Sequence, residues 1–236
     1  MELSTDFFKI LTPVLIGTTY LSAFKDGTPT CNRFIINYFL YLLTSFAIYF
    51  TAIKVYDEKD LQLKKGIRMI LSIAFLMLVI AIVYVKNVTA QHFIYLAILL
   101  IMAYLQRFHL QKIKKEVIEE TLKKMMVIIV ISMVIAIKYP QYMNDSFIKI
   151  LFFGLIFIII FRIFDIFLFD KKYHDIISSF AVFIFAYLIM YDTNRVIQAS
   201  KSCRVKGGKP NYVDHVLDMF MNLVSLFKNL SDVLDE

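Results

Sequence analysis

Charged side chains lie inside one apolar stretch of the sequence and directly after another, and these residues are the first candidates for chemistry. Arg162 and Asp165 lie inside the apolar run Phe147–Leu168, and Asp192 follows directly after the run Ile176–Met190. If these runs lie in hydrocarbon, a charge at the helix centre costs about 2.5–3.5 kcal/mol on insertion scales. A carboxylate kept in such a place indicates an ion pair or a group that attracts a hard cation.

Each of these charges has a structural and a functional explanation. Arg162 and Asp165 are three residues apart, so they share a helix face and can pair with one another, or Arg162 can pair with another helix. Asp192 can lie at a helix end that emerges among lipid headgroups, where an aspartate costs little, or it can face the interior of a bundle. The sequence leaves these alternatives open.

The last apolar segment, Tyr212–Leu230, predicts an amphipathic helix with a polar stripe. Such a helix lies flat on a membrane with its stripe in water, or it occupies the middle of a bundle with its stripe toward a wet cavity. Periodicity alone does not separate the two arrangements. Five polar residues recur at spacings of 4, 4, 3 and 4, which places them on one face: Asp214, Asp218, Asn222, Ser225 and Asn229.

Motifs of soluble enzymes are missing from the sequence. It contains no phosphate-binding loop, no dinucleotide-binding glycines, no nucleophile elbow and no paired metal histidines. Neither Asp165 nor Asp192 has the Gly-Asp-type setting of an intramembrane aspartyl protease. We therefore expect no enzymatic activity, no cofactor and no metal site.

Composition indicates an all-α integral membrane protein. Of the 236 residues, 59% are hydrophobic and 19% are charged, whereas soluble domains average about 45–50% and about 25%. Backbone groups in lipid must be hydrogen-bonded internally, and continuous apolar runs favour helices over a closed barrel. The formal net charge of +7 resides mainly in the connections, where it suits anionic lipid headgroups better than nucleic acid.

The apolar runs predict a bundle of seven transmembrane helices, or eight with the N-terminal segment. Phe7–Phe24 is interrupted by a lysine, a proline and a glycine, and it can span the membrane or lie at its interface. The basic stretch Arg107–Lys124 is expected to extend the two short runs beside it. We divide the chain into an N-terminal segment, 1–33, and a bundle with a central last helix, 34–236. The predicted segments are Phe34–Ile53, Ile67–Val85, Phe93–Tyr104, Met125–Ile137, Phe147–Leu168, Ile176–Met190 and Tyr212–Leu230.

The basic residues are divided unequally between the two sides of the predicted bundle. The side with Lys54–Arg68, Arg107–Lys124 and Lys171–Lys172 carries 13 Lys and Arg residues, against 10 on the other side. Since basic loops stay in the cytoplasm, this small excess indicates that the richer side is cytoplasmic. Cys31 and Cys203 fall on the other side, where a disulfide can form in an oxidising compartment, although two separate thiols are the simpler expectation.

Three motifs near the C-terminus follow one another in a recognisable order. They are Tyr191-Asp192-Thr193-Asn194, then Pro210-Asn211-Tyr212-Val213, then Leu217-Asp218-Met219-Phe220-Met221-Asn222-Leu223-Val224-Ser225-Leu226-Phe227. This pattern resembles the Bax-inhibitor-motif family over Ser179–Leu230, about 50 residues. The upstream helices agree with the family only in number and length. The sequence looks most similar to the divergent members carried by large DNA viruses.

The resemblance implies a bundle whose last helix is surrounded by six others. It also implies a pH-sensitive cation leak, mainly for Ca²⁺, in endoplasmic reticulum, Golgi or related membranes, and suppression of cell death. In the family, two aspartates of the last two helices share protons and control opening. The first corresponds to Asp192 and the second to Asn222. Since an amide does not titrate, the coupling of two carboxylates is lost, unless Asp218, one turn earlier, replaces the missing partner.

Two functions follow from these observations. The first is a Ca²⁺ leak in which charged Asp192 pairs with a basic latch, Arg162 or Arg68, and protonation releases that latch; Asp165 belongs to the same candidate site. The second is structural: a protein of the internal membrane of a large DNA virus, without ion flux, which the loss of the second aspartate favours.

The expected partners and location follow from the same hypotheses. The lipid bilayer is the first partner, with anionic lipids at the basic loops, and capsid or other membrane proteins are the second. Nucleic acid is not expected. The chain is placed in a host endomembrane, endoplasmic reticulum or Golgi, or in the internal membrane of a virion.

Overall fold

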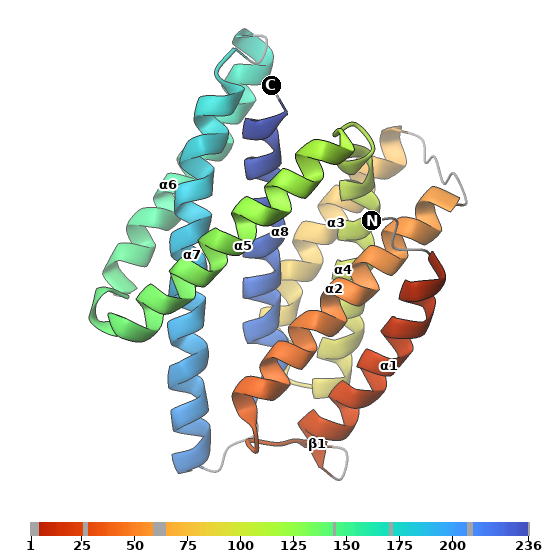
Figure 1. Cartoon of the computed structure of the whole chain (residues 1–236), viewed down its shortest axis with the longest axis vertical. Coiled ribbons are helices and arrows are strands. Elements are labelled where there is room, and N and C mark those ends of the chain that lie inside the picture. Colours follow the sequence, from red (N-terminus) through yellow and green to blue (C-terminus); the bar gives the residue numbers. More distant parts are fainter. Residues whose placement is uncertain are drawn as a thin grey trace. The chain divides into compact units, whose positions relative to one another are not determined.

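The computed structural model describes residues 5–25, 28–58, 65–143, 145–169, 172–206 and 210–235. Within these residues the chain forms eight α-helices, one short 3-10 helix and one pair of two-residue strands (Figure 1). In chain order the elements are α1 (Thr5–Ala23), β1 (Phe24–Lys25), β2 (Thr28–Pro29), α2 (Phe34–Glu58), α3 (Lys65–Tyr84), α4 (Val88–Leu110), α5 (Lys115–Lys138), η1 (Pro140–Tyr142), α6 (Asp145–Leu168), α7 (His174–Lys206) and α8 (Tyr212–Leu234).

Local sequence signals set several of the helix ends. Asn87 caps α4, because its side-chain oxygen accepts a hydrogen bond from the backbone N–H of Ala90 at 3.1 Å. α5 has Glu116 in its first turn and Lys138 in its last, which complements the helix dipole. The end of α4 and the start of α5 take up most of Arg107–Lys124, which confirms that this basic stretch extends two helices.

The surface of the chain is apolar and several of its buried residues are polar. On α3 and α6 many large apolar side chains are exposed, among them Ile73, Phe153 and Phe157, whereas Asn37 and Ser178 are fully buried. This distribution suits a lipid environment, where polar groups must find partners inside the protein. Of the described helices, α2, α3, α4 and α7 are long and apolar enough to cross a membrane. The fold is therefore an all-α bundle of membrane helices, as predicted.

The chain forms two compact units. The first comprises Met1–Lys112 with Ala199–Leu217, and the second comprises Ile113–Gln198 with Asp218–Glu236. α7 and α8 each contribute residues to both units.

In the first unit, hydroxyl pairs connect α1 to α2. Thr12 and Thr51 are joined at 2.9 Å between their Oγ1 atoms, and Thr19 and Thr44 at 2.7 Å. Hydrogen bonds of this kind hold membrane helices together where the hydrophobic effect contributes little. Within the N-terminal segment, Thr5–Ala23 therefore forms a helix packed along α2 (Figure 1).

A disulfide closes one end of the same unit. Cys31 and Cys203 are bonded, with their Cα atoms 5.7 Å apart, so the expectation of two separate thiols is wrong. Close to this link, the Tyr212 hydroxyl donates to the carbonyl oxygen of Thr30 at 2.6 Å, and the Asn37 amide donates to that hydroxyl at 3.2 Å. The start of α8 is thus attached to the loop that precedes α2.

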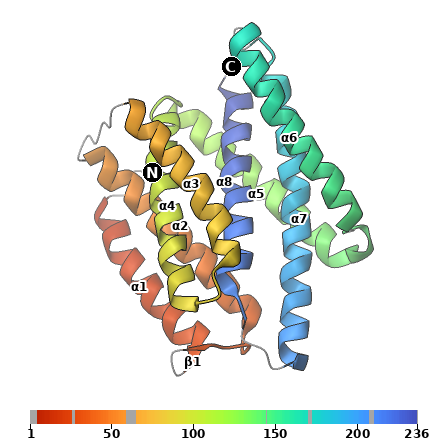
Figure 2. The ribbon, with the colours of Figure 1, turned by 180° about the vertical axis from the view of Figure 1, so that it is seen from behind.

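In the second unit, α6 and α7 run side by side (Figure 1 and Figure 2). Gly154 permits this approach, because a Cβ atom there would lie 3.1 Å from Cδ1 of Ile184. On α8, Met219, Phe220 and Leu226 are fully buried. A helix lying flat on a membrane surface would leave these side chains uncovered by protein, so α8 is packed inside the protein and the flat arrangement is wrong.

Candidate functional site

Asp192 lies within α7 and not at its end. The helix continues from His174 to Lys206, because no glycine or proline interrupts the sequence between Tyr191 and Lys206. Asp192 is 5% exposed. The explanation of Asp192 as a helix end among headgroups is therefore wrong, and its carboxylate is a buried polar group of the second unit.

The buried carboxylate contacts Asn222, the second position that the resemblance singles out. Nδ2 of Asn222, on α8, donates a hydrogen bond to Oδ2 of Asp192 at 2.7 Å. The two positions that the motifs single out are thus in contact, with an amide where a second carboxylate was expected from the family. An amide donor satisfies one lone pair of the carboxylate without adding charge.

Asp218 is held by a different partner. Nη1 of Arg195, one turn after Asp192 on α7, donates to Oδ2 of Asp218 at 2.6 Å, and both side chains are about two-fifths exposed. Asp218 therefore forms an ion pair of its own with α7. Sequence analysis did not select Arg195; its signal was the spacing of three residues from Asp192, which places both on the same side of α7.

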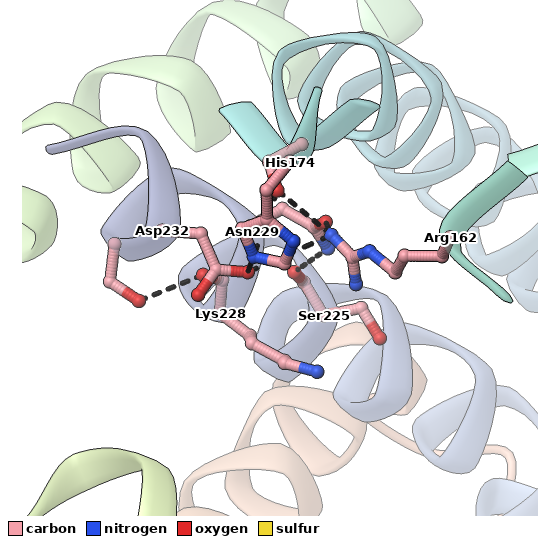
Figure 3. Close-up of polar contacts among 8 residues, drawn as sticks. Arg162, His174, Ser225, Lys228, Asn229 and Asp232 are labelled. Atoms are coloured by element: carbon pink, nitrogen blue, oxygen red, sulfur yellow. Dashed lines mark hydrogen bonds and ion pairs between the residues drawn. The ribbon is translucent and has the colours of Figure 1, made fainter. Parts of the chain in front are cut away.

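Arg162 and Asp165 do not pair within α6. Nη2 of Arg162 donates to Ser178 Oγ at 2.8 Å and to Asn229 Oδ1 at 2.7 Å, so its partners come from α7 and α8 (Figure 3). Oδ1 of Asp165 accepts from the backbone N–H of Tyr173 at 2.9 Å. The intrahelical ion pair is not formed, because both side chains find partners beyond their own helix.

The two proposed latch residues are engaged elsewhere. The groups that bind Arg162 include Ser178, which precedes Asp192 by 14 residues on α7, a distance of about 20 Å along a helix. Arg68 belongs to the first unit, where its guanidinium lies 5.1 Å from the centre of the Phe108 ring. This is the geometry of a cation–π contact.

The second unit therefore contains a small acidic group, which we call the carboxylate site: Asp192, Arg195, Asp218 and Asn222. Counted over these four side chains, it carries one net negative charge when both carboxylates are ionised. An oxygen-rich site with a net negative charge can attract a hard cation such as Ca²⁺.

Comparison with protein families gives a match over most of the chain. The family model described as "Inhibitor of apoptosis-promoting Bax1" matches residues 31–236. The match covers all helices from α2 to α8 and includes each residue of the carboxylate site.

A curated relative matches a shorter segment. It is an "Uncharacterized membrane protein" of Vibrio cholerae serotype O1 (strain ATCC 39315 / El Tor Inaba N16961), 32% identical over 84 residues. The alignment covers 36% of this chain and 34% of the relative, so the chain spans about a third of the length of that protein.

Proposed function

Because the chain belongs to the family described as inhibitor of apoptosis-promoting Bax1, we propose that this multi-pass membrane protein is a cation leak, permeable to Ca²⁺, whose opening depends on Asp192. The observation that carries the proposal is the hydrogen bond from Asn222 to the buried Asp192 carboxylate. It joins α7 to α8 at the two positions that control opening in the family that the sequence resembles.

The proposed mechanism starts from the charge of Asp192. When the carboxylate is ionised, it accepts the Asn222 amide at 2.7 Å, and the contact ties α7 to α8. When the carboxyl group binds a proton, the charge-assisted bond becomes a weaker neutral one, and the two helices separate more easily. Because Asn222 cannot titrate, a single proton governs the contact.

The ion pair next to this contact supplies the second connection. Arg195 and Asp218 link the same two helices one turn away, in a more exposed position. Such a pair contributes about 0–1 kcal/mol, so it guides the register of α7 on α8 without holding the helices by itself. The mechanism therefore assigns control to Asp192 and a supporting role to Asp218.

The proposal extends to the role in the cell. A regulated Ca²⁺ leak from an internal store such as the endoplasmic reticulum or Golgi lowers the store's content, and this is how the chain would suppress cell death. The proposal requires no catalysis and no resident cofactor, since Ca²⁺ is the transported ion.

The experiment is Ca²⁺ efflux from liposomes that contain the purified full-length chain, at pH values from about 6 to about 8. Wild type is compared with Asp192→Asn and Asp218→Asn, and with Asp175→Asn as the matched control, which removes a carboxylate elsewhere on α7. We expect efflux to change several-fold with pH in wild type and in the control, to lose its pH dependence in Asp192→Asn, and to change little in Asp218→Asn. Efflux of Asp192→Asn equal to wild type at every pH would contradict the mechanism.

A second function, a structural protein of the internal membrane of a large virion, is favoured by one observation. Asn222 stands where the family has its second proton-binding residue, so flux itself could have been lost while the fold was kept. Efflux no greater than from protein-free liposomes, together with the chain in purified particles, would support this function. Particles that lack the chain would argue against it.

A further inference from the structure

A second group of polar residues lies where α6, α7 and α8 meet near their ends (Figure 3). His174 is the first residue of α7, and Asp232 lies two residues before the last residue of α8. We call this group the basic cluster; its members are Arg162, His174, Ser178, Ser225, Lys228, Asn229 and Asp232. All of them belong to the second unit.

The single carboxylate of the basic cluster contacts three other members of the cluster. Oδ2 of Asp232 lies 3.6 Å from Nη2 of Arg162 and 3.3 Å from Nε2 of His174. It also accepts a long hydrogen bond from Ser178 Oγ at 3.5 Å. Asp232 therefore orients the guanidinium and the imidazole.

Several nitrogen atoms of the same cluster are left without a partner. Nε of Arg162 and Nδ1 of His174 are buried and make no hydrogen bond within the part of the chain that the structure describes. The Lys228 ammonium has no dashed contact in Figure 3. A buried polar group without a partner costs about 1–3 kcal/mol, and such groups in native proteins commonly indicate a missing ligand, ion or water.

The charge of the cluster also calls for an anion. Arg162 and Lys228 face one carboxylate among the members of the cluster, so the cluster carries one net positive charge when Lys228 is charged and His174 is neutral. Arg162 and Lys228 repel one another, while Asp232 attracts Lys228. Asp165, three residues after Arg162 on α6, directs Oδ1 to the backbone N–H of Tyr173 at 2.9 Å and is not counted among the members of the cluster.

We propose that the basic cluster binds a phosphate group. A guanidinium, an ammonium and an imidazole from three helices offer N–H donors in different directions, which a tetrahedral oxyanion with several acceptor oxygens satisfies. The ends of helices that cross a membrane lie near the lipid headgroups, and α7, whose first residue is His174, is long and apolar enough to cross one. The headgroup of a phosphatidic acid molecule and soluble inorganic phosphate present this same group.

The first test measures which phosphate source binds. The full-length chain, with its disulfide intact, is followed by native mass spectrometry with phosphatidic acid or phosphatidylcholine, and by thermal melting with inorganic phosphate at constant ionic strength. We expect retention of phosphatidic acid over phosphatidylcholine, or a rise in melting temperature with phosphate. The first result identifies a lipid headgroup as the ligand and the second a soluble phosphate; neither effect in wild type overturns the proposal.

The second test locates the site. Lys228→Gln removes the ammonium of the cluster. Lys149→Gln is the matched control, because it removes an exposed lysine from α6 that lies 13 residues from Arg162, about 20 Å along the helix. We expect the phosphate probe to bind about tenfold more weakly to Lys228→Gln, because one charge-assisted contact is lost. Binding to the control should be unchanged. Equal weakening in both variants would indicate a general charge effect and overturn the proposal.

A variant that removes a negative charge instead of a positive one tests the proposal if Lys228→Gln does not fold. Asp232→Asn removes the only negative charge of the cluster and keeps the shape of the side chain. We expect this variant to bind the phosphate probe several-fold more tightly than wild type. Unchanged or weaker binding would contradict a phosphate site among these residues.

Discussion

The carboxylate site and the basic cluster use the same helices for opposite purposes. In the carboxylate site α7 and α8 share one net negative charge, and the described contacts satisfy Asp192 with an amide and Asp218 with Arg195. In the basic cluster the same two helices, together with α6, share one net positive charge and keep donors without partners. Ser178 and Asp192 are 14 residues apart on α7, so about 20 Å separates the two regions.

The carboxylate site therefore has the properties of a contact that holds helices together, whereas the basic cluster has those of a ligand-binding site. A contact whose groups are satisfied within the protein changes when one of its groups gains or loses a proton. A group of unsatisfied donors can change when a ligand arrives. A cation is attracted to the first region and repelled by the second, and each prediction below tests one side of that contrast.

The largest expected effect is on the basic cluster. Arg162→Met leaves the Asp232 carboxylate and the Asn229 and Ser178 side chains without their common partner. Breaking a buried pair in this way costs about 3 kcal/mol, which should appear as a clearly lower melting temperature of the full-length chain in detergent. Arg68→Met, which removes an arginine from the surface of Phe108, is the control. An equal decrease in melting temperature in the two variants would contradict the prediction, because the contacts of Arg162 in the cluster would then stabilise the protein no more than those of Arg68.

The next effect concerns the carboxylate site and depends on pH. Asn222→Asp places two carboxylates in contact, and their repulsion is relieved when one binds a proton. Stability should therefore fall as pH rises, by about 1 kcal/mol between pH 6 and pH 8, as measured by melting temperature.

The same substitution in the basic cluster provides the comparison. Asn229→Asp places a carboxylate where Oδ1 of Asn229 now accepts a hydrogen bond from Nη2 of Arg162 at 2.7 Å. We expect no loss of stability as pH rises in this variant. If both variants lose the same stability as pH rises, the pH dependence does not arise from the opposite charges of the two regions.

A smaller effect of opposite sign is expected from Lys228→Gln in phosphate-free buffer. Removing the ammonium relieves its repulsion with Arg162, so the melting temperature should rise by a few degrees, which corresponds to about 1 kcal/mol in a chain of this size. Lys149→Gln should leave the melting temperature unchanged. A lower melting temperature for Lys228→Gln would mean that the ammonium already stabilises the fold without a ligand.

The smallest effect is expected at the exposed ion pair. Asp218→Asn should lower the free energy of unfolding by less than about 1 kcal/mol, because both side chains of the pair are about two-fifths exposed. The difference from wild type should shrink further in high salt. A loss as large as that of Arg162→Met would place Asp218, rather than Asp192, at the centre of the carboxylate site.

The sequence was sufficient to predict the class of fold, and its resemblance to a family pointed to one contact. Continuous apolar runs predicted the helices, and the motifs around Asp192 and Asn222 pointed to the two residues that α7 and α8 bring together. The start of α2 at Phe34 and of α8 at Tyr212 agrees with the predicted segments. These features depend on local composition and spacing, which a single sequence contains.

The remaining features depend on how helices face one another. Periodicity shows that Arg162 and Asp165 share a face of α6, but not that Ser178 and Asn229 are near enough to draw Arg162 away from Asp165. For the same reason, the pairing of Arg195 with Asp218 could not be predicted. The polar residues after Met190 predict a connection, but α7 continues to Lys206 because no glycine or proline there stops the helix.

The disulfide between Cys31 and Cys203 has a consequence for biogenesis. It spans 172 residues of sequence, a segment that contains the whole of α2 to α6 and most of α7. The bond can therefore close only after these helices have been synthesised and threaded so that both cysteines reach the same oxidising side of the membrane. The fraction of oxidised chain on a non-reducing gel would thus serve as a maturation marker, which reports that insertion of the polypeptide has been completed in a single topology.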